Sequence, residues 1–113
     1  MTREEFIKIL EEEGYSYEIE NEDKIIITYP GGVWLDSLET LPPGVVFKNV
    51  RDVNLESLKT LPPGVEFRNG GDVYLNSLMK ILPGVSFDSW ECNIEGVDPK
   101  RLLNLMISKG VFA

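Results

Sequence analysis

A 20-residue repeat is the feature that most constrains how this chain can fold. Three segments align without a gap: residues 33–52 (VWLDSLETLPPGVVFKNVRD), residues 53–72 (VNLESLKTLPPGVEFRNGGD) and the residues from 73 onward (VYLNSLMKILPGVSFDSWEC). They share the frame V-x-L-x-S-L-x-x-L-P-P-G-V-x-F-x-N, in which the third copy has Ile81-Leu82 in place of Leu-Pro. A single repeat cannot bury its own apolar face, so neighbouring repeats must share one core.

Each repeat contains two short segments in which apolar residues alternate. This period of two predicts two strands per repeat, each with inward-facing apolar side chains. The segments are Val33-x-Leu35, Val53-x-Leu55 and Val73-x-Leu75, followed by Val45-x-Phe47, Val65-x-Phe67 and Val85-x-Phe87. The Pro-Gly elements between them predict a corner, because proline fixes φ and glycine accepts a positive φ.

The residues before the repeats predict a helix and a hairpin. Thr2 and Glu5 form a capping box, and the apolar stripe that follows ends at Gly14. Residues 15–20 and 24–29 predict the two strands of a hairpin. Counting back by one repeat places Ile25 and Ile27 in register with Val45 and Phe47.

The residues after the repeats predict a second helix, begun by Asp98-Pro99 and carrying an apolar face of Leu102, Leu103, Met106 and Ile107. We therefore expect an α+β fold: a short parallel β-solenoid of three coils, with a helix and hairpin at one end and a helix at the other. The whole chain, 1–113, is expected to be one domain, with residues 1–32 and 92–113 as caps and residues 33–91 as the repeats.

The repeats resemble those of leucine-rich repeat proteins, in particular the small bacterial and bacteriophage forms. The V-x-L and L-P-P-G-V elements of residues 33–90 carry the resemblance, and the two caps extend it: the helix and hairpin before GGVWLDSL, and the closing segment NIEGVDPKRLLNLMI. It implies a protein-binding solenoid without catalytic residues. Valine at the strand starts and the second strand at V-x-F depart from the commonest pattern, which leaves a curved horseshoe and a straight two-sided solenoid both open.

Composition excludes several classes of function. The net charge of −8 would repel nucleic acid, whose binders need clustered Lys and Arg. No apolar run is long enough to span a bilayer, no secretory signal is found, and a single cysteine cannot form an internal disulfide. We expect a cytoplasmic protein that binds neither membrane nor nucleic acid, as a monomer or weak homodimer.

No residue pattern predicts catalysis or a cofactor. The chain has no histidine, so Cys92 has no base to activate it and is expected to be a small core residue. The recurring Ser37, Ser57 and Ser77 are interpreted as turn residues, as are Asn49, Asn69, Asp52 and Asp72. Gly70-Gly71-Asp72 is one isolated match to calcium-binding repeats, so we expect no metal, no cofactor and no enzymatic activity.

The outward positions of the repeat differ between copies and are the candidates for binding. On the first row of strands the predicted partner-binding residues are Trp34, Asp36, Asn54, Glu56, Tyr74 and Asn76. Aromatic side chains are typical interface anchors, although packing of the N-terminal cap over Trp34 is the competing interpretation. On the second row the outward residues are Val46, Glu66, Ser86, Lys48, Arg68 and Asp88, and Trp90 is expected in the core.

The sequence thus predicts a non-catalytic module that binds an unidentified protein through the first row of strands. The alternative is a phage-encoded inhibitor whose acidic surface imitates nucleic acid and blocks a basic host protein, for example in a defence complex. A hydrolase is the third and least favoured hypothesis.

Overall fold

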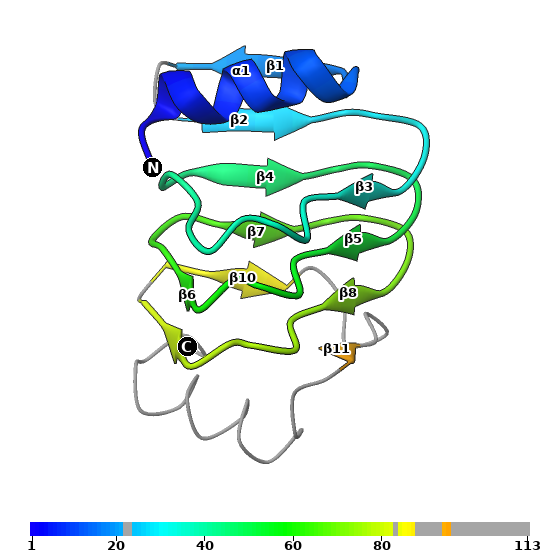
Figure 1. Cartoon of the computed structure of the whole chain (residues 1–113). Coiled ribbons are helices and arrows are strands. Elements are labelled where there is room, and N and C mark those ends of the chain that lie inside the picture. Colours follow the sequence, from blue (N-terminus) through cyan, green and yellow to red (C-terminus); the bar gives the residue numbers. More distant parts are fainter. Residues whose placement is uncertain (22–23, 83, 88–93, 96–113) are drawn as a thin grey trace.

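The computed structural model describes residues 1–21, 24–82, 84–87 and 94–95. Within these residues the chain forms one helix, α1 (Arg3–Glu13), and short strands in three sheets. Figure 1 shows α1 at one end of the molecule, with the strands of successive repeats following one another below it.

The helix α1 begins and ends where the sequence predicts. The Thr2 side chain accepts a hydrogen bond from the Glu5 amide, and Gly14 follows the helix in the left-handed conformation at φ 77°. Phe6 and Leu10 are buried on the face that α1 turns toward the sheets. Within the described part of the chain, no helix is long and apolar enough to cross a membrane.

The largest sheet has five strands in the order β1-β2-β4-β7-β10. Their bounds are Tyr17–Glu20 (β1), Lys24–Ile27 (β2), Val45–Phe47 (β4), Glu66–Phe67 (β7) and Ser86–Phe87 (β10). β1 and β2 pair antiparallel as the predicted hairpin, and the remaining pairs are parallel. Ile25 lies opposite Val45 and Ile27 opposite Phe47, which confirms the register inferred from the repeat.

The second sheet is parallel and has the order β11-β8-β5-β3. Its strands are Val33–Trp34 (β3), Val53–Asn54 (β5), Val73–Tyr74 (β8) and Ile94–Glu95 (β11). Val33 lies opposite Val53, and Val53 opposite Val73, so the first row of strands follows the 20-residue spacing as expected.

A third sheet was not expected from the sequence. β6 (Thr60–Leu61) and β9 (Lys80–Ile81) pair in parallel, with Leu61 opposite Ile81. The sequence pattern predicted Leu61 and Ile81 only as core residues and predicted no strand here.

The expected three-coil parallel β-solenoid with two caps is wrong. The strands fall into three separate sheets, the largest sheet is mixed, and none of the three closes on itself. The physical reasons are local: the hairpin adds an antiparallel pair to one sheet, and β6 and β9 pair separately from the other strands. The helix expected within residues 92–113 lies outside the described residues, as do Asp88, Trp90 and Cys92.

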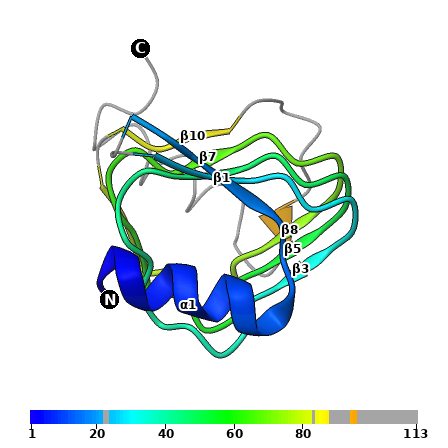
Figure 2. The ribbon, with the colours of Figure 1, turned by 90° about the horizontal axis from the view of Figure 1, so that it is seen from above.

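One apolar core lies between the sheets, and Figure 2 shows the strands of successive repeats surrounding it. The rings of Phe47 and Phe67 stack within it, with centroids 5.2 Å apart and planes 4° apart. The corners predicted from the Pro-Gly elements are confirmed at Gly44, Gly64 and Gly84, whose φ angles of 78°, 78° and 90° favour glycine.

Candidate interaction surface

Three parallel strands bring the predicted first-row residues together. Trp34 on β3 lies opposite Asn54 on β5, and Asn54 lies opposite Tyr74 on β8. The preceding valines Val33, Val53 and Val73 are fully buried, because successive residues of a strand point to opposite faces of a sheet. The three predicted residues therefore share the outward face.

Trp34 is the most exposed aromatic side chain among the described residues, with 54% of its surface accessible. The N-terminal cap does not cover it, so the competing interpretation of this residue is wrong. Its ring lies against the backbone of Gly32, where an added Cβ would stand 1.9 Å from the indole Cζ3 atom. Gly32 thus leaves room for the indole.

The backbone of Trp34 is held by a residue that the sequence did not identify. The Trp34 N–H donates to the Tyr15 hydroxyl at 2.9 Å, and this hydroxyl lies 3.4 Å from the Trp34 carbonyl oxygen, to which it donates. The Tyr15 ring in turn packs edge-on against Tyr29, with centroids 5.0 Å apart. No spacing in the sequence signals this contact, because Tyr15 lies outside the repeat.

The remaining predicted residues lie on the neighbouring strands and in the turns that follow the strands. Tyr74 and Asn54 are half-buried, and the Asn54 Oδ1 accepts a hydrogen bond from the Glu56 amide at 3.0 Å. The exposed side chains Asp36, Glu56 and Asn76 lie in the turns after the three strands. These turns also contain Ser37, Ser57 and Ser77, which confirms the interpretation of the serines as turn residues.

The outward row of the five-stranded sheet differs from its prediction. Val46 is only 2% exposed, although the repeat frame placed it among the outward residues. Glu66, its neighbour on β7, pairs with Arg68 at 3.0 Å and with Lys24 of β2 at 3.5 Å. The Lys24–Glu66 pair spans β4, which lies between the two strands.

This charge cluster changes the acidity of Glu66. Burial by itself would raise the pKa of the Glu66 carboxyl. The hydrogen bond and positive charge of Arg68, together with those of Lys24, outweigh burial and lower the pKa below its ordinary value. The carboxylate form is therefore favoured in the folded protein.

Two buried asparagines join neighbouring repeats. The Asn49 Nδ2 donates to the carbonyl oxygens of Gly31, Arg51 and Asp52, at 3.0–3.1 Å. Asn69 repeats the arrangement one repeat later, as the sequence interpretation of both as turn residues implied. The Asn49 Oδ1 atom, in contrast, is buried without a hydrogen-bond partner among the described residues.

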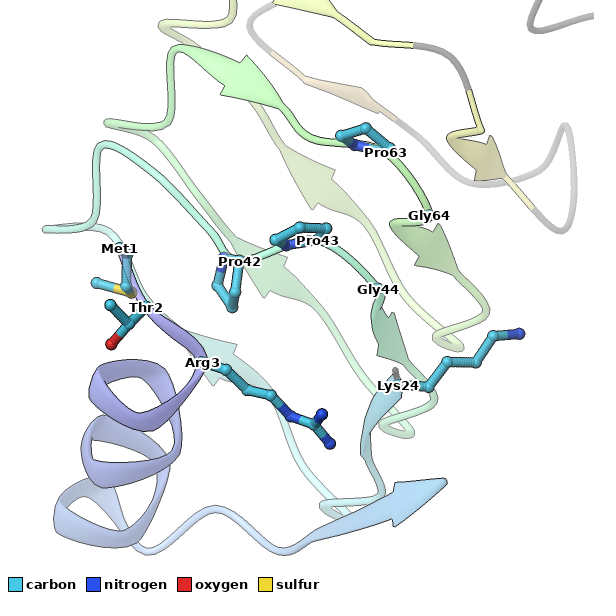
Figure 3. Close-up of a pocket in the computed structure, with 9 residues that line it drawn as sticks. All are labelled: Met1, Thr2, Arg3, Lys24, Pro42, Pro43, Gly44, Pro63 and Gly64. Atoms are coloured by element: carbon cyan, nitrogen blue, oxygen red, sulfur yellow. The ribbon is translucent and has the colours of Figure 1, made fainter. Parts of the chain in front are cut away.

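A groove of about 620 Å³ runs along the Pro-Gly corners. Its lining residues are Met1, Thr2, Arg3, Lys24, Pro42, Pro43, Gly44, Pro63 and Gly64. Figure 3 shows the two basic residues of the groove, Arg3 at the start of α1 and Lys24 on β2. The Thr2 hydroxyl is bonded to Glu5 and Lys24 is paired with Glu66, so few polar groups remain to orient a small ligand.

Comparison with known proteins gives no relative. No protein-family model, no curated protein and no solved structure matches this chain. The resemblance to leucine-rich repeat proteins therefore stays a prediction. In the part of the chain that the structure describes, no three Cys, Asp or Glu side chains form a group that could hold a metal ion.

Proposed function

We propose that this chain is a non-catalytic module that binds another protein on the face formed by β3, β5 and β8. The observation that carries the proposal is Trp34, whose indole is 54% exposed while its backbone N–H and C=O are both bonded to Tyr15. Tryptophan is enriched among the residues that dominate binding energy. An anchor whose backbone is already held loses less conformational freedom when it binds.

The surroundings of Trp34 indicate the chemistry of the partner. Tyr74 adds a second, half-buried aromatic ring, while Asp36 and Glu56 carry exposed carboxylates. A complementary partner would offer an apolar pocket for the indole with Lys or Arg at its rim. Three strands at ~4.8 Å spacing span about 15 Å, so the contact is a small patch rather than a long groove.

The chemistry of the chain also supports a non-catalytic role. Without histidine, the chain lacks the commonest general base, and the groove at the Pro-Gly corners has its hydroxyl and its lysine engaged in the protein's own bonds. The face formed by β3, β5 and β8 consists of exposed turn and strand residues. Such a face suits the binding of another protein surface better than catalysis.

The test compares a substitution of an exposed residue on the proposed face with a substitution of an exposed residue outside it. The immobilised chain is used to recover its binding proteins from cells of its source, and the recovered protein is then titrated against purified variants. Trp34→Ala should weaken binding about thirtyfold, the effect of losing a ~2 kcal/mol anchor. Met79→Ala is the matched control, because Met79 is 63% exposed and lies before β9 rather than on the proposed face. If Trp34→Ala binds as tightly as the control, the proposal is wrong.

A second candidate is favoured by the distribution of charge. Residues 1–21 contain seven exposed glutamates and only two basic residues, Arg3 and Lys8. Most of the net charge of −8 therefore lies at the α1 end. An acidic end of this kind supports the alternative of an inhibitor that imitates nucleic acid and occupies a basic protein.

Salt separates the two candidates. Binding anchored by Trp34 should change little between low and moderate salt, because burial of an indole is not screened. Binding that imitates nucleic acid should weaken steeply over the same range, and it should be lost when Glu11, Glu12 and Glu13 are replaced by Gln. Titration of the recovered partner at several salt concentrations decides between them.

A further inference from the structure

The strand β1 forms an open edge of the five-stranded sheet. It is the outermost strand in the order β1-β2-β4-β7-β10. In Figure 1 it lies at the end of the molecule that carries α1. Figure 2 looks onto that end, with α1 and β1 nearest the viewer. Glu18, Ile19 and Glu20 are all exposed.

Along β1, the backbone N–H and C=O groups of successive residues point alternately toward β2 and toward the opposite side. The Thr28 amide donates to the Ser16 carbonyl at 3.0 Å, which makes residues 16 and 28 a hydrogen-bonded pair. Such pairs alternate along an antiparallel ladder, so Glu18 and Glu20 bond β2 next. The N–H and C=O groups of Tyr17 and Ile19 therefore point away from β2, and among the described residues they meet no backbone partner there.

The other edge at this end of the molecule is closed. On β3, the Val33 and Leu35 amides donate to the carbonyls of Asp52 and Asn54, which turns the N–H and C=O of Trp34 outward. The Tyr15 hydroxyl occupies both of these groups. A side chain thus covers the edge of one sheet, while within the described part of the chain the edge of the other sheet stays uncovered.

The side chains of β1 define what could pair with it. Glu18 and Glu20 project from one face of the strand, and Ile19, which is 47% exposed, projects from the other. An added strand would place its own side chains directly opposite these residues. Opposite charges across a strand pair stabilise it and like charges destabilise it.

We propose that β1 is a docking strand for an extended segment of another protein in which basic and apolar residues alternate. The segment's backbone would bond the outward groups of Tyr17 and Ile19, with Lys or Arg opposite Glu18 and Glu20 and an apolar side chain beside Ile19. This is strand addition to a sheet edge, in which backbone bonds give affinity and alternate side chains give specificity. Four residues at ~3.3 Å each limit the contact to a short segment of about 13 Å.

A second copy of the chain does not fit this edge. If two β1 strands paired antiparallel about Glu18 or Ile19, a glutamate would stand opposite a glutamate, because opposite residues share a face. The same carboxylates that admit a basic segment therefore oppose self-association through β1, a common protection of edge strands.

The test uses fluorescently labelled peptides and the full chain, with binding measured by fluorescence anisotropy. A peptide of alternating Lys and Val should bind saturably at one site. The same peptide with methyl groups on the amide nitrogens that face β1 keeps its charge but loses its donors, and it should bind at least about tenfold more weakly. A peptide with Glu in place of Lys should not bind. Equal binding of the methylated and unmethylated peptides would overturn the proposal, since charge alone would then explain the affinity.

Variants of the chain locate the site. Ile19→Pro removes an outward N–H that takes no part in the β1–β2 ladder, so the fold should persist in circular dichroism while peptide affinity falls at least about tenfold. Glu18→Lys with Glu20→Lys should reverse the preference toward the Glu peptide. Trp34→Ala should leave peptide binding unchanged, which separates this edge from the face proposed for the main partner. Unchanged binding by Ile19→Pro, or a dimer in sedimentation that Ile19→Pro abolishes, would contradict the proposal.

Discussion

Asn49 and Asn69 illustrate how a single polar side chain can stabilise a turn between repeats. Each amide nitrogen has two hydrogens, and each lies within hydrogen-bond distance of three backbone carbonyl oxygens. One of these carbonyls belongs to the turn one repeat earlier, so each side chain joins two turns. The Asp52 and Asp72 carbonyls also accept from the amides of Val33 and Val53, so each asparagine adds a donor to a turn that already bonds a neighbouring strand.

Asn69→Ala should lower the free energy of unfolding by about 1–3 kcal/mol, because it removes the side-chain donor shared by the carbonyls of residues 51, 71 and 72. Asn69 is a cleaner test than Asn49, whose own Oδ1 is an unpaired acceptor among the described residues. Urea unfolding of both variants would measure the change. The control is Asn76→Ala at an exposed position, which should stay within about 0.5 kcal/mol of the original chain. Similar losses in both variants would contradict this account.

At the scale of the elements, the outer strands β1 and β3 differ in how their outward backbone groups are bonded. β1 and β3 are outer strands of different sheets, yet among the described residues a side chain bonds the outward backbone groups of β3 and none is seen to do so on β1. Tyr17 ties the start of β1 to the helix instead, because its hydroxyl donates to the Glu11 carboxylate at 2.7 Å. This hydrogen bond, with desolvation and the negative charge of Glu11, raises the pKa of Tyr17.

Tyr15→Phe tests how much the covering of the β3 edge contributes. The phenylalanine ring can keep its edge-on contact with Tyr29, so the variant removes only the hydroxyl that bonds Trp34. We expect a loss of about 1 kcal/mol in unfolding free energy and faster hydrogen exchange at the Trp34 amide. Hydrogen exchange read residue by residue by NMR is the measurement. An unchanged exchange rate at Trp34 would show that the hydroxyl does not hold this edge.

At the scale of the whole molecule, the charges are unevenly distributed. The α1 end carries most of the negative charge, while Lys24, Glu66 and Arg68 form a cluster across the five-stranded sheet. Lys24 and Glu66 lie on strands separated by β4, so this cluster joins parts of the chain that are about two repeats apart. Its effect on stability should be visible in the unfolding of the entire domain.

Glu66 predicts a pH dependence of unfolding. The pKa of Glu66 is lowered in the folded chain, so the unfolded chain binds more protons as pH falls below the ordinary value of 4.5. The stabilisation is therefore complete above that pH and is lost as pH falls through the lower, folded pKa. Glu66→Gln should flatten this part of the pH profile in urea unfolding, and Arg68→Gln should reduce it. A Glu66→Gln profile as steep as that of the original chain would contradict the assignment.

The spacing of residues along the chain was sufficient to predict features that depend on near neighbours. The Thr2 cap, the Gly14 end of α1 and the corner glycines follow from local backbone preferences. The 20-residue frame also predicted the strand register, because identical segments stacked on one core align their identical positions. These predictions needed no knowledge of contacts between unlike segments.

Contacts between segments of different sequence decided the rest. The separate β6–β9 sheet, the mixed five-stranded sheet and the burial of Val46 overturned parts of the predicted architecture. The repeat pattern placed Trp34 on the outward face, but its support by Tyr15 was beyond that pattern. The physical reason is that a repeat specifies how equivalent residues align, whereas the covering of an edge or face depends on side chains brought near it by folding.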